Sequence, residues 1–199
     1  GDLIAGCYQV RAFDAKGNFN VPGKNTVWTA SSSELTVMNP VEFSYRSLDG
    51  AHFIVKVAID ENYLFTVTST IKGGKALDSA SIVPKVRLFK SKDSLMNAPK
   101  GSYSGAIGVI EGQLKEYKYD DVRNTATNVT NNLNWLGITD KYWLTAVIPA
   151  RECQAAATVQ GSIENDNEYL VTEVKFEPSD SVSFSLFAGP KCVDLLERY

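Results

Sequence analysis

Histidine, cysteine and acidic side chains are the residues that could carry chemistry in this chain, and their small number limits it. The 199 residues include one histidine, His52, and three cysteines, Cys7, Cys153 and Cys192. A nucleophilic triad needs a base beside its serine or cysteine. His52 lies in a run of alternating apolar residues, which predicts a solvent-facing strand histidine rather than a catalytic base.

The three cysteines are far apart in the sequence and form no C-x-x-C pair. An odd number cannot complete a set of intramolecular disulfides. We expect three buried apolar thiols, with one disulfide and one free thiol as the alternative. No ligand cluster for zinc surrounds His52, and the chain contains no phosphate-binding G-x-x-x-x-G-K-[ST] loop. The sequence therefore predicts neither a metal nor a cofactor.

Three pairs of carboxylates could in principle provide acid–base chemistry of the glycosidase type. They are Asp60 with Glu61, Asp120 with Asp121, and Glu164 with Asp166. Each pair lies in a predicted turn, where acidic residues also favour turning and solubility. We therefore predict that the chain is not an enzyme. A sugar-binding or aldose-epimerase-like sandwich remains the alternative, because large β-sandwiches include sugar-converting enzymes.

The charge of the chain also limits the classes of ligand that it is expected to bind. The net charge is −3, and lysine and arginine are scattered rather than gathered in a stripe. This argues against nucleic acid or an anionic lipid as the main ligand. No stretch approaches the ~18 consecutive apolar residues that a membrane-spanning helix needs.

The elements that would position these residues are strands, since apolar residues recur with a period of two. Residues 181–187 alternate strictly and residues 168–176 alternate similarly, which predicts strands with one buried face. Other segments are predicted to form two β-hairpins and several weaker strands, so the chain is mainly β. It has no internal repeat of fixed period. The hairpins are 52–60 with 63–71 and 106–110 with 113–119, and the weaker strands are 27–30, 35–37, 82–89 and 158–163.

Three segments receive more specific predictions. Residues 142–148 are apolar at consecutive positions, which predicts a central strand covered on both faces. Pro84 places its strand toward a sheet edge, because proline cannot donate a ladder hydrogen bond. Residues 120–134 are rich in Asn, Thr and Asp and lack periodicity, so we expect a long loop.

The C-terminal residues show the one helical pattern of note. Cys192, Leu195, Leu196 and Tyr199 fall at i, i+3, i+4 and i+7 and form one apolar stripe after Gly189-Pro190. This predicts a short helix over 191–199 that packs on the sheet. The stripe stops at Tyr199 without a capping residue, and we expect the natural chain to continue there.

Two segments carry a resemblance to a known family. Trp135–Pro149 resembles the W-x-G-x-x-D-K-Y-[FW]-x-x-A-x-I-P segment of YidC-type membrane protein insertases. Phe187–Lys191 resembles the F-x-G-P-K exit from the last strand of the same family's large extracytoplasmic domain. Residues 25–30, 60–67 and 108–114 also look like parts of that domain.

The resemblance implies an antiparallel β-supersandwich (galactose-mutarotase-like) over residues 1–199 with a short C-terminal α-helix. It implies a single domain that faces the periplasm, between the first and second helices of an insertase anchored in the inner membrane. The resemblance further implies that membrane insertion itself occurs in a groove among membrane helices, which this sequence does not contain. No residue that handles substrate is therefore carried over to this chain.

The resemblance also implies a function and partners. The domain would assist insertion and folding of inner-membrane proteins as a non-catalytic interaction or scaffold surface. Its partners would be auxiliary subunits of the Sec translocon and nascent membrane proteins, not nucleic acid. The candidate structural or interface residues are Trp135, Tyr142, Trp143, Cys192, Leu195, Leu196 and Tyr199.

Overall fold

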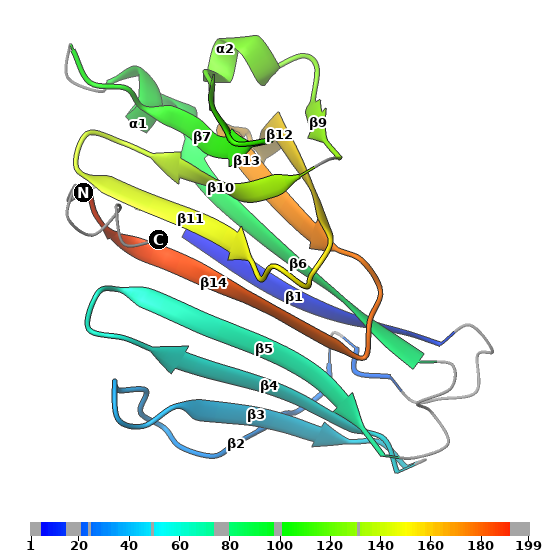
Figure 1. The fold of residues 1–199 in the computed structure, drawn as a ribbon. Helices are drawn as coiled ribbons and strands as arrows, with labels where there is room; N and C mark the ends of the chain where they lie inside the picture. Colours follow the sequence, from blue (N-terminus) through cyan, green and yellow to red (C-terminus); the bar gives the residue numbers. More distant parts are fainter. Residues whose placement is uncertain are drawn as a thin grey trace.

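In the part of the chain that the structure describes, the strands form two antiparallel sheets, one of five strands and one of nine (Figure 1). This computed structural model describes residues 5–14, 21–23, 25–48, 50–73, 80–97, 101–130 and 132–191, with 5–14 and 80 described by their backbone alone. The predicted antiparallel β-sandwich is confirmed. The helix predicted over 191–199 lies, apart from Lys191, outside the described residues.

The five-stranded sheet combines the first described strand with strands from the middle and the later part of the sequence. Its order is β1 (Ala5–Asp14), β6 (Ala80–Ser91), β13 (Asn167–Phe176), β12 (Ala155–Glu164) and β9 (Thr127–Val129). The β12–β13 hairpin is long and regular, with pairs from Ala155–Phe176 to Glu164–Asn167. The short β9 pairs with β12 only at 157–159.

The nine-stranded sheet contains the two predicted hairpins. Its order is β2 (Thr29–Ala30), β3 (Val41–Arg46), β4 (His52–Ile59), β5 (Leu64–Lys72), β14 (Ser181–Pro190), β11 (Trp143–Pro149), β10 (Leu133–Thr139), β7 (Gly105–Ile110) and β8 (Gln113–Tyr117). The hairpins β4–β5 and β7–β8 confirm the predictions for 52–71 and 106–119. Glu111 and Gly112 connect β7 to β8 with φ of 53° and 73°, as a tight hairpin turn requires.

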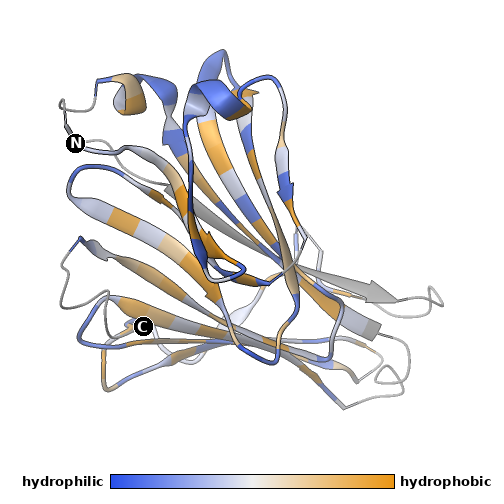
Figure 2. Cartoon of the chain, turned by 45° about the horizontal axis from the view of Figure 1, so that its top comes forward, coloured by the Kyte–Doolittle hydropathy of each residue, from blue (hydrophilic) through white to orange (hydrophobic). Residues whose placement is uncertain are grey.

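Alternation along the strands builds the core between the sheets. In β13, Leu170, Thr172, Val174 and Phe176 are all buried, as the pattern predicts. Figure 2 shows hydrophobic and hydrophilic residues alternating along the strands. Phe176 of one sheet stacks on Phe184 of the other, with ring centroids 5.2 Å apart. The two sheets therefore share one apolar interior.

The expectation of a long loop over 120–134 is wrong. This segment contains most of helix α2 (Tyr119–Val122), all of β9 and the beginning of β10. Tyr119 and Val122 bury their side chains one helical turn apart. The elements were missed because they are too short to show a period, and β9 obtains its partner from the distant β12.

Pro84 is not on an edge strand, because β6 lies between β1 and β13. The last registered pair with β13 is Lys85–Lys175, so Pro84 lies one residue beyond it and its missing N–H removes no bond to β13. The strand predicted at 35–37 is also wrong, since Thr36 makes only an isolated bridge with Asn39. The other weak strands correspond to β2, β6 and β12.

Candidate functional site

Asp140 organises the turn between β10 and β11 at one end of the sandwich. Its Oδ1 accepts the backbone N–H of Tyr142 at 2.9 Å and of Trp143 at 2.8 Å. A carboxylate that binds the N–H groups two and three residues onward fixes a tight turn. The Asp-Lys-Tyr-Trp sequence therefore presents Lys141, Tyr142 and Trp143 on a rigid backbone.

Lys90 ties this turn to the opposite sheet. It is the last-but-one residue of β6, and its Nζ donates to Asp140 Oδ2 at 3.0 Å (Figure 1 shows the two elements). Only 2% of Lys90 is exposed. A buried ammonium needs a partner of opposite charge, and Asp140 supplies one across the gap between the sheets.

The pKa of Asp140 reflects these contacts. Burial by itself would raise the pKa of this carboxyl, but the N–H groups of Trp143 and Tyr142 and the ammonium of Lys90 outweigh it. The pKa of Asp140 consequently lies below its ordinary value, and the carboxylate is held in its charged form.

The end of the last described strand meets this turn, and the first described strand begins beside the end of β6 that carries Lys90. Lys191, directly after β14, donates its backbone N–H to Tyr142 O and its Nζ to Asp140 O, both at 2.7 Å. At the other terminus, Ala5 of β1 pairs with Phe89, the neighbour of Lys90. We call Lys90, Asp140, Tyr142, Trp143 and Lys191 the Asp140 corner.

Three of the predicted interface residues are described by the structure. Tyr142 and Trp143 lie together, whereas Trp135 lies apart from them. Tyr142 and Trp143 lie at the corner and are 62% and 52% exposed. The prediction that 142–148 is covered on both faces is therefore wrong at its beginning. Residues 142 and 143 extend to the end of the sheet, where no second layer covers them among the described residues. The Nζ of Lys141 lies 4.9 Å from the Tyr142 ring centroid.

Trp135 lies further along β10 and is half-buried. It packs against a small apolar cluster formed by Leu144, Ala146 and Phe187. These residues alternate with core residues such as Val147 and Phe184, so the cluster lies on the sheet face that points away from the core. The remaining candidates, Cys192, Leu195, Leu196 and Tyr199, fall outside the described residues.

The residues considered for chemistry lie apart from one another. His52 begins β4, between Arg46 and Lys72 of the neighbouring strands, and its pKa is lowered by partial burial and then by the charge of Arg46. Cys153 is a half-buried free thiol that accepts the Ser183 N–H at 3.4 Å. Within the described ranges, no three His, Cys, Asp or Glu side chains are grouped as metal ligands.

The pairing of Lys90 with Asp140 was not predicted from the sequence. A signal was present, because Ile82, Val86 and Leu88 are buried at alternate positions and Lys90 continues the same register. A charged residue at an inward position requires a buried partner. The sequence could not show which carboxylate it is, since Asp140 lies 50 residues away.

Comparisons with known proteins agree with the resemblance. The sequence model of the YidC periplasmic domain matches residues 7–199. "Membrane protein insertase YidC" of Rickettsia prowazekii (strain Madrid E) is 34% identical over 90% of this chain and 33% of that protein. The proteins of the same name from Rickettsia bellii (strain OSU 85-389) and Rickettsia africae (strain ESF-5) are each 33% identical over 90% of this chain.

This chain spans about a third of the length of these relatives. None of the helices in its described residues is long and apolar enough to cross a membrane. The family match covers most of the chain, including the Asp140 corner and both sheets. The chain belongs to the family of YidC periplasmic domains.

Proposed function

We propose that this domain is a non-catalytic part of a membrane protein insertase and offers an interaction surface at the Asp140 corner. The domain would face the periplasm in a protein anchored in the inner membrane. Its partners would be auxiliary Sec subunits or membrane proteins undergoing insertion. The observation that carries the proposal is the pair of exposed aromatic side chains, Tyr142 and Trp143, on a turn fixed by Asp140.

The geometry of the corner supports a docking role. Large aromatic side chains on a rigid backbone lose little entropy on binding and are enriched in protein interfaces. Tyr63 adds a third exposed aromatic residue at the same end, since its carbonyl accepts the Ala188 N–H at 3.1 Å beside the end of β14. The surface thus extends across the ends of β5, β14 and β11.

Photo-crosslinking in native membranes tests the proposed surface. The full-length insertase would carry a photoreactive phenylalanine at Tyr142 or, as a matched control, at Leu48, which is 92% exposed at the other end of β4. We expect adducts with Sec subunits or nascent membrane proteins from position 142 and not from position 48. Equal labelling from both positions would contradict an interface at the corner.

We also propose that the predicted tail helix covers the outer apolar cluster of Leu144, Ala146 and Phe187. Support comes from the position of the cluster, since Phe187 belongs to β14 and the chain leaves that strand three residues later, at Pro190. The predicted stripe of Cys192, Leu195, Leu196 and Tyr199 has the apolar character that such a surface would bury.

Replacing Leu195 and Leu196 together with serine tests this packing. Burial of two leucines is worth roughly 3–5 kcal/mol before entropy losses, so the melting temperature should fall clearly. The same replacement at exposed Leu48 and Leu114 is the control and should change it little. A melting temperature unchanged by the tail substitutions would rule out the docked helix.

A further inference from the structure

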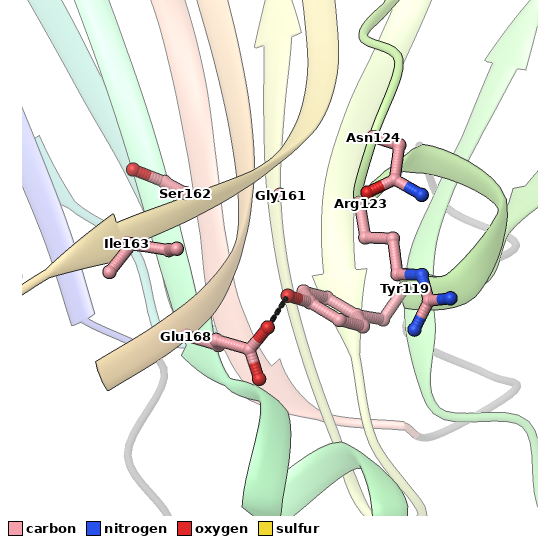
Figure 3. Close-up of a pocket in the computed structure, with 7 residues that line it drawn as sticks. All are labelled: Tyr119, Arg123, Asn124, Gly161, Ser162, Ile163 and Glu168. Carbon is pink, nitrogen blue, oxygen red and sulfur yellow. Dashed lines mark hydrogen bonds between the residues drawn. The ribbon is translucent and has the colours of Figure 1, made fainter. Parts of the chain in front are cut away.

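A pocket of about 300 Å³ lies between α2 and the end of the β12–β13 hairpin (Figure 3). Tyr119, in α2, and Arg123, directly after α2, line one side of it. Gly161 and Ile163 line it from β12, and Glu168 from β13. A Cβ at Gly161 would lie 2.8 Å from Arg123 Cα, so glycine is what allows α2 to approach β12 so closely.

The negative charge in the pocket is already neutralised. Glu168 Oε1 accepts the hydroxyl of Tyr119 at 3.0 Å, the bond drawn in Figure 3, and Oε2 is paired with the ammonium of Lys92. The ammonium and then the hydroxyl hold the pKa of Glu168 below its ordinary value. Glu168 is therefore a structural part of the pocket wall.

The positive charge of Arg123 is held much less firmly. Its Nη1 lies 3.7 Å from Asp120 Oδ1, and the two side chains are 51% and 62% exposed. That distance is too long for a good hydrogen bond, and an exposed pair of this kind contributes little. The guanidinium fork can therefore bind an added carboxylate with two parallel hydrogen bonds.

The strand beside the pocket has an open edge. β12 pairs with β13 along its whole length, but on its other side β9 pairs only with 157–159. Residues 160–164 have no strand partner on that side among the described residues. Alternate residues of such an edge point their N–H and C=O outward, ready to pair with another extended chain.

Two residue types that commonly block strand addition are absent from this edge. Edge strands are commonly protected by lysine or proline, and β8, an edge of the large sheet, carries Lys115. Residues 160–164 read Gln-Gly-Ser-Ile-Glu and include neither. Ile163 is 71% exposed there, an apolar side chain that a neighbouring peptide would cover.

From these observations we infer that residues 160–164 of β12 accept an extended peptide of another chain as an added strand. An aspartate or glutamate side chain of that peptide binds Arg123 in the adjoining pocket. Backbone pairing provides affinity for any extended segment, while the pocket selects for the acidic side chain. This site is separate from the Asp140 corner, so it does not depend on the function proposed there.

Binding of labelled peptides to the 199-residue chain tests the inference. The probe is a fluorescent nonapeptide of alternating Thr and Val with a central Glu, compared with one that carries Lys instead and one whose alternate amides are N-methylated. We expect the Glu peptide to bind at least about tenfold more tightly than either, the ratio that corresponds to one charge-assisted hydrogen bond. Slower amide hydrogen exchange at 160–164 would locate the peptide.

Substitutions then separate the pocket from general charge effects. Arg123→Gln should abolish the preference for Glu over Lys, and Arg123→Glu should reverse it. Lys115→Gln, which removes an exposed charge from β8, should leave the preference intact. The inference is overturned if no peptide binds at millimolar concentration, if Arg123→Gln keeps the preference, or if Lys115→Gln removes it equally.

Discussion

Lys90 and Lys92 are separated by one residue at the end of β6, yet they belong to two very different surroundings. Lys90 is buried, and its carboxylate partner lies in the opposite sheet. Lys92 begins α1 (Lys92–Met96) and pairs with Glu168, with 29% and 40% of the two side chains exposed. The same pair of chemical groups thus closes the sandwich at one place and borders an open pocket at the other.

The difference follows from the direction of the chain. Lys90 still follows the alternation of β6 and points inward, where its side chain is buried. After Ser91, whose Oγ accepts the Ser94 N–H at 3.3 Å and caps α1, the backbone turns away. Lys92 therefore reaches only the rim, beside the Tyr119 ring. A buried pair constrains the fold, whereas an exposed pair leaves neighbouring groups free to bind.

The largest expected effect comes from breaking the buried pair. Asp140→Ala leaves the Lys90 ammonium without its carboxylate and removes the acceptor of two backbone N–H groups. The loss of unfolding free energy should be about 3–5 kcal/mol, measured by urea denaturation. The double variant Lys90→Met/Asp140→Asn, which removes both charges, should lose less. A loss below about 1 kcal/mol for Asp140→Ala would show that the pair is not a structural clamp.

The second-largest expected effect concerns two glycines, one near the Asp140 corner and one in the wall of the pocket. A Cβ at Gly137 of β10 would lie 2.1 Å from Thr145 O and 2.7 Å from Ala146 Cα, so paired strands of the sheet would have to separate. Gly137→Ala should cost about 3 kcal/mol. At Gly161 the added Cβ meets only the end of the short α2, so Gly161→Ala should cost nearer about 1 kcal/mol. Urea denaturation of both variants measures the difference, and equal losses would contradict it.

The sequence predicts the regular parts of this fold because those parts depend on local pattern. Leu170, Thr172, Val174 and Phe176 are buried at alternate positions, although Val171 is buried as well. The turn at Glu111-Gly112 needs positive φ that glycine provides. The Asp140 corner was only partly predictable. The Asp-Lys-Tyr-Trp sequence marks the turn, but the exposure of Trp143 depends on how far the opposite sheet extends.

The pocket at α2 could not be predicted from the sequence. Tyr119 and Glu168 lie 49 residues apart, and the pattern around 120–134 indicates only a loop. The open edge of 160–164 is likewise invisible in the sequence, since it exists only because β9 is three residues long. Features of this kind arise from the lengths of neighbouring elements rather than from residue type.

A smaller effect is expected in the pH dependence of stability, which should distinguish the carboxylate of Asp140 from that of Glu168. The folded pKa of Asp140 lies below its unfolded value, so its stabilising contribution is present above about pH 4 and is lost as the pH falls. Glu168 has the same sign of shift, with an exposed partner. Free energies of unfolding between pH 7 and pH 2 should fall less steeply in Asp140→Asn than in the native chain. Glu168→Gln should change the slope less, and a larger change for Glu168→Gln would reverse the comparison.

The smallest expected effect belongs to Lys92. Lys92→Met removes an exposed ammonium, and Glu168 keeps its hydrogen bond from Tyr119, so the urea midpoint should match that of the control Lys115→Met. The pKa of Glu168 should nevertheless rise toward its ordinary value, because Lys92 is the main cause of its depression. Carboxyl NMR titration measures this shift. A clear loss of stability in Lys92→Met alone would mean that the pocket rim is as structural as the Asp140 corner.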